Sequence, residues 1–380
     1  MSTLKKLALA PLALAAALTA LSAQAQDAKT KLPALWEAPS DRSATTGNTS
    51  APANWRLSPT ASFNGVANAF NGTALLLFTT TQAAGTYACS GSLVSSEWLL
   101  TAAHCADGLI SMTVNLGYYA GSALETRTAV SAIQHPGWDG SLDSGADVAL
   151  IKLSAPVTNL NIYALSTTND VGKTQLITGY GTSGTGSSSA SPSWADSAYG
   201  HYGYNVADVE SSVLFAAWDA ANPGAGTYTP PTYGATYVSD FDYYNAASTA
   251  AQRAQYNTLD RMQLLTGGSW TSGEVLGTNE ALIAGGDSGG GDFIWDATNN
   301  RWVLSAVHSW GWQFCGGRIS PSCDFRSNNS SSYGDISGST AVFSHVGWIN
   351  SVIAVPEPAT YALMAMGLFA VGAAARRRRA

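Results

Sequence analysis

Apolar residues in the middle of the chain occur in short runs rather than in long helical repeats. Runs of strand length are bounded by Gly, Ser and Asn, and clear examples are residues 74–78, 149–153, 174–177 and 303–307. Many short strands joined by glycine-rich turns are typical of an all-β sandwich or a pair of barrels. Residues 26–60 show little periodic hydrophobicity and predict a leader or a short propeptide in front of the folded domain.

A longer apolar run lies near the N-terminus. Lys5 and Lys6 precede the apolar residues 7–21, and small residues ending at Ala25 then occupy the positions that a signal peptidase reads. The pattern predicts a signal peptide over residues 1–25. Signal peptidase is therefore an expected processing partner, and the exported chain is expected to start at Gln26.

A second long apolar run lies near the C-terminus. Residues 359–375 are just long enough to span a bilayer, and the arginines at 376–379 would stay on the cytoplasmic side. The pattern predicts a transmembrane segment over 359–375. It fits an ordinary C-terminal membrane anchor as well as a sorting tail that is removed after export.

Composition narrows the function classes. The chain has 38 glycines, only 11% charged residues and a formal net charge of -7, which suits a β-rich exported domain and argues against nucleic acid as a partner. Four cysteines suffice for two disulfides in an oxidising compartment. Because no His, Cys or Asp cluster has metal-ligand spacing in the sequence, we expect neither a metal nor another cofactor. The sequence does not indicate an oligomeric state.

Three motifs carry the candidate chemistry. Ser288 lies in the glycine-rich stretch 285–291, His104 lies in the segment 99–105, and Asp147 begins the apolar run 147–153. A serine hydroxyl needs an imidazole to accept its proton, and a buried carboxylate must hold that imidazole in the correct tautomer. The three residue types in this order predict a nucleophile, a base and an orienting acid.

Each motif alone has a simpler explanation. A glycine-serine run is often a flexible loop, a lone histidine is often structural, and Asp147 alone fits a cap at the start of a strand. Their joint occurrence favours the catalytic interpretation. The attacked carbonyl would become an oxyanion, and the backbone N–H groups of Gly286 and Ser288 are the predicted donors to it.

These motifs belong to a longer resemblance to trypsin/chymotrypsin-type serine endopeptidases. It covers about residues 63–352 and includes the segments 89–105, 134–138, 179–181 and 341–349. The resemblance implies a protease domain over 61–352 with two packed six-stranded antiparallel barrels, a catalytic cleft between them and a C-terminal helix. It also implies hydrolysis of protein or peptide substrates through an acyl-enzyme.

The cysteines follow the same resemblance. It implies a disulfide between Cys89 and Cys105. The remaining cysteines, Cys315 and Cys323, lie close together in the sequence and are expected to form the second disulfide.

The C-terminal residues 353–380 resemble the PEP-CTERM sorting tail of Gram-negative bacteria. Pro356, Glu357 and Pro358 precede the apolar run and the arginine-rich end. The resemblance implies removal by an exosortase. It also implies delivery to the cell surface or the extracellular matrix, with transient anchoring in the membrane.

The chain departs from the family in its middle. Asp147 and Ser288 are 141 residues apart, which implies a tyrosine-rich insertion at about 182–257. The tyrosines could form a binding surface, or the insertion could be a folded loop that packs its own aromatic rings.

A second departure concerns Asp287. In the family, an amino group newly freed by cleavage pairs with the aspartate before the nucleophile. The closest equivalent of that start, residues 63–66, has no basic residue just before it. A buried unpaired carboxylate is costly, so another group is expected to replace the missing terminus, and Arg318 is one candidate.

The substrate pocket has two incompatible predictions. In the family, the residue six before the nucleophile forms the pocket base. Here it is Leu282 beside Ile283, which favours apolar or small side chains over Lys and Arg. His308 occupies the position of a pocket histidine in glutamate-specific relatives, although a packed strand histidine also explains it and is the favoured interpretation. The strand that pairs with the substrate backbone in the family resembles Ser309, Trp310 and Gly311.

Two function classes follow from these residues. The first is an exported serine endopeptidase with an apolar or small side-chain preference. The second is a surface or matrix binding protein on a protease fold whose catalysis is vestigial. The complete set of His104, Asp147 and Ser288 together with Gly286 favours the enzyme.

Overall fold

The computed structural model describes residues 45–46, 51–187, 194–223, 228–244, 247, 249–270, 276–313 and 331–354. The predicted signal peptide, the predicted transmembrane segment 359–375, Cys315, Cys323 and Arg318 lie outside these residues. Within the described ranges, no helix is long and apolar enough to cross a membrane.

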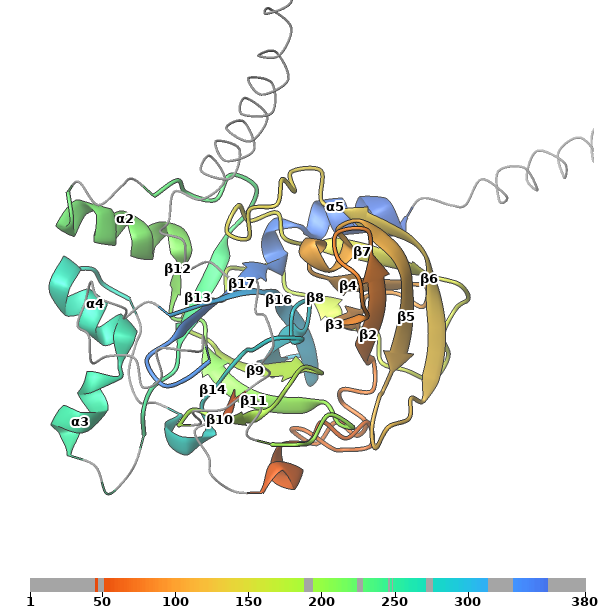
Figure 1. Ribbon diagram of the computed structural model, residues 1–380, viewed down its shortest axis with the longest axis horizontal. Coiled ribbons are helices and arrows are strands. Elements are labelled where there is room, and N and C mark those ends of the chain that lie inside the picture. Colours follow the sequence, from red (N-terminus) through yellow and green to blue (C-terminus); the bar gives the residue numbers. More distant parts are fainter. Residues whose placement is uncertain are drawn as a thin grey trace, which may run out of the picture.

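Six antiparallel strands in the first half of the chain close into a barrel (Figure 1). Its closed order is β2-β3-β4-β7-β6-β5, with β2 at Thr73–Thr80, β3 at Tyr87–Leu93, β4 at Trp98–Thr101, β5 at Leu109–Leu116, β6 at Glu125–Gln134 and β7 at Ala149–Leu153. Burial alternates along β5 because successive side chains of a strand point to opposite faces, so Met112, Val114 and Leu116 join the core. Leu76 and Leu150 from other strands fill the same interior.

The rest of the chain builds a second sheet. Its order is β11-β9-β15-β16-β17-β13-β12, and β8 pairs with β16 off this path. The strands are β8 at Ala164–Leu165, β9 at Thr174–Gly179, β11 at His201–Val206, β12 at Val209–Glu210, β13 at Thr236–Asp240, β15 at Gly291–Asp296, β16 at Arg301–Trp312 and β17 at Ile336–Ala341.

The predicted all-β class is confirmed, but among the described strands only the first of the two expected barrels is closed. The second sheet stays open because β13 and β12 continue beyond β17 and do not form a ladder with β11. Its two ends still approach each other, since the side chain of Asn205 on β11 donates to the backbone oxygen of Asp240 on β13 (2.9 Å). A side-chain bridge thus stands where a closed barrel would have a backbone ladder.

A small third sheet includes part of the predicted leader. The strand β1 (Thr45–Thr46) lies between β10 (Gly184–Thr185), to which it is parallel, and β14 (Ala281–Leu282), to which it is antiparallel. The chain before the closed barrel is therefore paired, through its backbone, with the segment that contains Leu282.

Residues 51–60 also pack against the domain. After the 3-10 helix η1 (Pro52–Trp55), Trp55 and Leu57 are buried. Arg56 forms an ion pair with Asp196 (2.6 Å), and its backbone makes an isolated bridge to His201 on β11. The folded part of the chain thus begins earlier than position 61, where the sequence analysis placed its start.

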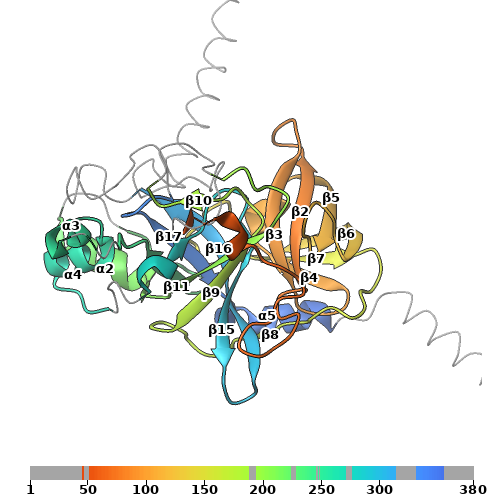
Figure 2. The same cartoon turned by 90° about the horizontal axis from the view of Figure 1, so that it is seen from below.

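The predicted insertion 182–257 is not one loop region. It contains β10 to β13 and the helices α2 (Ser211–Ala221) and α3 (Ala250–Gln255), and α4 (Thr258–Thr266) follows directly. The helices α2 to α4 lie on the side of the second sheet away from the closed barrel (Figures 1 and 2). The segment therefore supplies several strands of the second sheet, and it also supplies helices of the layer beside that sheet.

This helical layer has its own apolar core. Phe215 of α2 and Met262 of α4 pack with Trp310 and Trp312 of β16 in one buried cluster. Tyr228 and Tyr237 are buried, Tyr228 within that cluster, whereas Tyr233 is 47% exposed. Burial of these hydroxyl-bearing rings accords with the folded-loop interpretation of the insertion.

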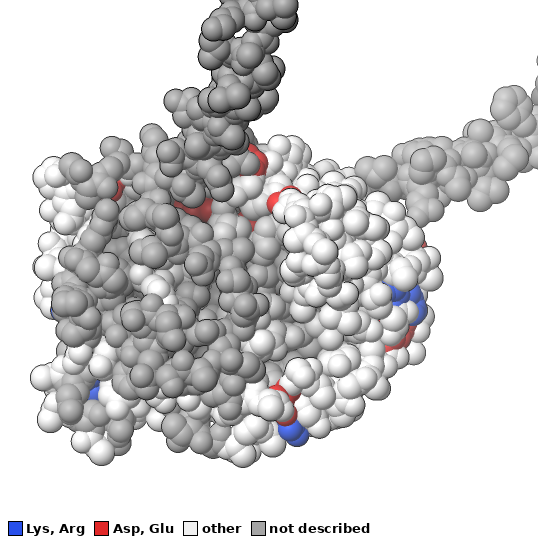
Figure 3. All heavy atoms as spheres, viewed as in Figure 1, with Lys and Arg blue, Asp and Glu red and all other residues white. Residues whose placement is uncertain are grey.

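The chain returns to the closed barrel near its end. After the 3-10 turn η4 (Val342–Ser344), the helix α5 (Val346–Ile353) places Ile349 in the barrel core. The predicted C-terminal helix is confirmed. On the face shown in Figure 3, charged side chains are few and scattered over the described surface.

Candidate active site

His104 and Asp147 are brought together by the closed barrel. His104 lies in the 3-10 turn η2 (Ala103–Ala106) after β4, and Asp147 lies just before β7, which pairs with β4. The Asp147 Oδ2 atom is 2.8 Å from His104 Nδ1, and Oδ1 accepts the backbone N–H of His104 (2.9 Å). Ser309 Oγ also donates to Asp147 Oδ2 (2.5 Å). The carboxylate is fully buried, so these bonds fix its orientation.

This pair can serve as a general base. Burial disfavours the charged imidazolium, but the nearby charge and hydrogen bond of Asp147 raise the pKa of His104. With Nδ1–H directed at the carboxylate, the Nε2 atom of the neutral ring is left as the proton acceptor.

The nucleophile loop follows β14 and precedes β15, and it reaches across to the closed barrel. The backbone oxygen of Ser288 accepts from Ser90 N–H on β3 (2.7 Å). The same oxygen lies 3.7 Å from the sulfur of Cys105, the neighbour of His104. The structure therefore places the loop of Ser288 beside the turn of His104.

The glycines of this loop are sterically required. Gly286 has φ of +95°, and a Cβ there would lie 2.7 Å from Gly181 Cα. Gly289 has φ of +79°, and its Cβ would lie 2.0 Å from Thr101 Oγ1. Both positions combine a left-handed backbone with a close approach that only glycine tolerates.

Two amide groups of the loop are available to a ligand. The N–H groups of Asp287, Gly289 and Gly290 donate to backbone oxygens of the protein. Among the described residues, no oxygen accepts from the N–H groups of Gly286 and Ser288. These are the two donors that the sequence analysis assigned to an oxyanion, and a pair of preorganised amides is suited to that charge.

Asp287 receives backbone donors. Its Oδ1 accepts from Gly181 N–H (3.1 Å) and its Oδ2 from Ala284 N–H (3.1 Å). These two bonds compensate part of the cost of burying the carboxylate.

The expected pocket residues are buried. Leu282 packs with Phe241 and Tyr333, and Ile283 packs with Ile177. Their side chains are therefore part of the apolar packing behind the loop.

His308 is engaged on both ring nitrogens. Its Nε2 lies 2.6 Å from Asp292 Oδ1, and its Nδ1 lies 3.2 Å from the backbone oxygen of Asp287. Burial lowers its pKa, but Asp292 outweighs this effect and the pKa of His308 is raised. Both neighbours are oxygen acceptors, which matches a ring that donates from both nitrogens.

The predicted substrate strand, Ser309 to Gly311 of β16, packs against the helical layer. Trp310 is fully buried, and its indole N–H donates to Asp143 (3.3 Å), which also accepts from Tyr228. Burial raises the pKa of Asp143 to about 7, although the bond from Tyr228 opposes the shift. Gly311 pairs with Ser337 of β17. The indole of Trp310 therefore packs into the helical layer.

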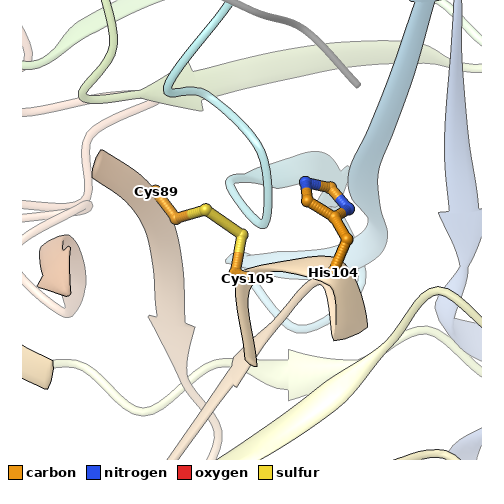
Figure 4. Close-up of side chains that lie close together, drawn as sticks. All are labelled: Cys89, His104 and Cys105. Atoms are coloured by element: carbon orange, nitrogen blue, oxygen red, sulfur yellow. A yellow bond between two sulfur atoms is a disulfide. The ribbon is translucent and has the colours of Figure 1, made fainter. Parts of the chain in front are cut away.

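The disulfide between Cys89 and Cys105 is confirmed, and it ties β3 to the turn that bears His104 (Figure 4). The His104 ring lies close to the disulfide, with its ligand atom and the two sulfurs within 4.8 Å of one another. Because both sulfurs are used in this bond, the three neighbouring residues do not form a metal site.

A buried acidic cluster lies behind the pocket segment. Carboxylate oxygens of Asp240, Asp242 and Glu280 lie within 4.8 Å of one another. Leu259 N–H donates to Asp240 (2.8 Å), and Asp242 N–H donates to Glu280 (2.9 Å). Burial raises the pKa of Asp240 to about 7. A proton on this carboxyl group can therefore reduce the repulsion among the three acids, so the cluster does not require a bound cation. Sequence reasoning missed this cluster, although the spacing of Asp240 and Asp242 is a local signal for it.

Comparisons with known proteins agree with this site. Residues 65–224 match the trypsin family model, and residues 354–379 match the PEP-CTERM protein-sorting motif. The chain is thus similar to the trypsin family over residues 65–224 and matches a PEP-CTERM sorting motif over residues 354–379. That motif indicates export and sorting to the cell envelope of Gram-negative bacteria.

Individual relatives cover only parts of the chain. Trypsin from Sus scrofa is 38% identical over 114 residues, which is 27% of this chain and 48% of that protein. Transmembrane protease serine 11G from Mus musculus is 39% identical over 79 residues, or 20% of this chain and 19% of that protein. The chain spans less than half the length of these relatives. A solved structure of HL collagenase aligns at a TM-score of 0.47 with 20% identity, covering 76% of this chain and 95% of that one.

Proposed function

We propose that the protein is an exported serine endopeptidase that hydrolyses peptide bonds through an acyl-enzyme on Ser288. The observation that carries the proposal is the pairing of His104 with buried Asp147 beside a loop whose Gly286 and Ser288 amides have no acceptor among the residues that the structure describes. A base and two amide donors at one nucleophile are what acyl transfer needs.

Each residue has a defined role in this mechanism. His104 accepts the Ser288 hydroxyl proton as the hydroxyl attacks the peptide carbonyl, and Asp147 stabilises the imidazolium that forms. The amides of Gly286 and Ser288 bind the oxyanion. His104 then gives the proton to the leaving amine, and a water molecule hydrolyses the acyl-enzyme by the same route in the next half-reaction.

We also propose a preference for apolar or small side chains before the cleaved bond. The apolar Leu282 and Ile283 supply no side-chain donor for a carboxylate. Recognition of glutamate through His308 has less support, because Asp292 and the Asp287 carbonyl engage both of its nitrogens. The second function class, a tyrosine-lined binding protein, is weakened by the burial of Tyr228 and Tyr237.

A peptide library tests the activity and the preference together. The purified wild type should cleave after apolar or small residues. Ser288→Ala and His104→Ala should each lower kcat by about 10⁴-fold or more, because these residues act as a unit. Labelling of Ser288 by a sulfonyl fluoride, detected by mass spectrometry, gives an independent readout. Wild-type turnover in Ser288→Ala would refute the nucleophile, and dominant cleavage after Glu that disappears in His308→Ala would refute the preference.

Processing is proposed from the two ends of the chain. Signal peptidase would remove residues 1–25, and the tail beyond Val355 would be removed by an exosortase. The intact mass of the protein from its native host checks both cuts, and retention of the arginines at 376–379 would contradict the second.

A further inference from the structure

The two oxyanion donors are oriented by bonds to the carbonyl groups of their own peptides. Thr182 N–H donates to Gly285 O (3.2 Å), and Gly290 N–H donates to Asp287 O (2.7 Å). In a planar trans peptide, the carbonyl points opposite to the N–H of the next residue. These bonds therefore direct the N–H groups of Gly286 and Ser288 away from the protein acceptors.

The peptide between these two donors is held by Ser90. Ser90 Oγ donates to Gly286 O (3.0 Å) and accepts from Tyr180 N–H (2.9 Å). The backbone N–H of Ser90 donates to Ser288 O (2.7 Å). Ser90 is fully buried on β3, so one residue of the closed barrel binds two carbonyl groups of the nucleophile loop.

The loop needs such a support. Glycine adopts the left-handed conformation of Gly286 without a steric penalty, but its backbone also has more alternative conformations than that of any other residue. Without the Ser90 hydroxyl, the half-buried Gly286 carbonyl and the Tyr180 N–H would each lose a partner, which favours rotation of the peptide toward another one.

We propose that Ser90 is a positioning residue: its hydroxyl holds the peptide between Gly286 and Asp287 so that the Gly286 and Ser288 N–H groups converge on one oxyanion. This inference rests on the proposed peptidase function. It assigns the closed barrel a role in oxyanion binding in addition to supplying His104 and Asp147.

The test compares two buried serines of the same strand. Ser92 is as buried as Ser90, and among the described residues its hydroxyl has no hydrogen-bond partner. Ser90→Ala should lower kcat about tenfold to a hundredfold with KM changed less than about twofold, since only transition-state binding is lost. Ser92→Ala should leave both constants unchanged.

A peptide boronic acid tests oxyanion binding directly, and its Ki should not change if Ser90 only stabilises the fold. Its tetrahedral adduct on Ser288 places an oxygen at the oxyanion donors, so its Ki should rise by the same factor as kcat falls in Ser90→Ala. The Ki of a peptide product, which forms no such adduct, should stay constant. Ser90→Gly keeps the backbone bond to Ser288 and serves as the second variant if Ser90→Ala does not fold.

The outcomes separate the two proposals. An active wild type with kcat in Ser90→Ala and Ser90→Gly within about twofold of normal would overturn the role of Ser90 alone. An equal loss in Ser92→Ala would also overturn it, because packing would then explain the effect. A wild type that neither cleaves peptides nor reacts with the sulfonyl fluoride would overturn the peptidase function and this inference together.

Discussion

The closed barrel and the second sheet hold their halves of the site in different ways. In the barrel, each strand pairs with a neighbour on both sides around a core of leucine, valine and methionine. Apart from Asp143 and Asp147, the buried carboxyl groups lie in the second sheet and its insertion, for example at Asp170, Asp208, Asp240, Asp292 and Asp335. The turn of His104 thus lies on an apolar core, whereas polar bonds from Ser90 and His308 hold the loop of Ser288.

This difference predicts different sensitivities. Apolar packing depends little on pH and is distributed over many contacts, so the barrel should resist local changes. A buried polar network loses stability whenever a partner is removed or changes its protonation. Changes outside the site should therefore affect the second sheet first.

The largest effect is expected from removing residues 26–60. A chain that starts at Ala61 lacks Trp55 and Leu57, whose burial is worth about 1.5–3 kcal/mol each, so unfolding should require about 3–6 kcal/mol less. It also leaves Asp196 without Arg56. Denaturant unfolding of this chain and of one that starts at Gln26 measures the difference.

Hydrogen exchange locates the same loss. Amides of β11, which carries His201, should exchange faster in the shortened chain, while those of β5 should change little. Equal acceleration in both strands would break the distinction between the two halves, and equal stability of the two chains would show that residues 51–60 are a dispensable leader.

A smaller loss is expected from removing the disulfide of the barrel. Cys89 and Cys105 are 16 residues apart, and closing a loop of that length stabilises a protein by about 3 kcal/mol. The double change Cys89→Ala and Cys105→Ala should lower the free energy of unfolding by that amount and loosen β3 and η2. A change below about 0.5 kcal/mol would show that strand pairing alone holds the His104 turn.

The smallest net effect is expected from pH, because groups with raised and lowered pKa values oppose each other, and burial lowers the pKa of His345 to about 4. Burial raises the pKa of Asp240 and of Asp143 to about 7, from an ordinary value of 3.8. Between these values the two carboxyl groups bind more protons in the folded state than in the unfolded state, so their contribution to stability should fall as pH rises from about 4 to about 7. The loss should lower Tm by several degrees.

Asp240→Asn should flatten this pH dependence, because its amide does not titrate and still accepts a hydrogen bond from Leu259 N–H. Calorimetric scans of both proteins at a series of pH values test this. An identical pH dependence of Tm in the wild type and in Asp240→Asn would contradict the raised pKa of Asp240.

The sequence predicts local features of this molecule far better than distant ones. His104 and Cys105 lie in one short segment, so their turn and the disulfide to Cys89 can be read from a motif, and the disulfide is confirmed. The roles of His104, Asp147 and Ser288 stay predictions, with geometry that supports them. The helical layer could not be predicted, because the apolar residues of α2 and α4 make sense only against Trp310 and Trp312 of a distant strand.

Ser90 illustrates the same limit within the site. It is separated from its acceptor at Gly286 by 196 residues, and nothing in the local pattern distinguishes it from Ser92. Its contact is decided by how the two halves of the molecule dock. The open second sheet was missed for a related reason: whether β13 turns back to β11 depends on a side-chain bridge from Asn205 rather than on hydrophobic periodicity.

The placement of α5 has a mechanical consequence. The helix ends at Ile353, directly before the sorting motif 354–379, and its Ile349 is buried in the closed barrel. A pull on the domain through that motif is therefore received first by the barrel, whose strands share the load through ladders on both sides. The loop of Ser288 lies between β14 and β15, outside the closed barrel, and is not on the direct path of this force. While the domain is joined to that motif, a pulling force would therefore reach the closed barrel before it reaches the loop of Ser288.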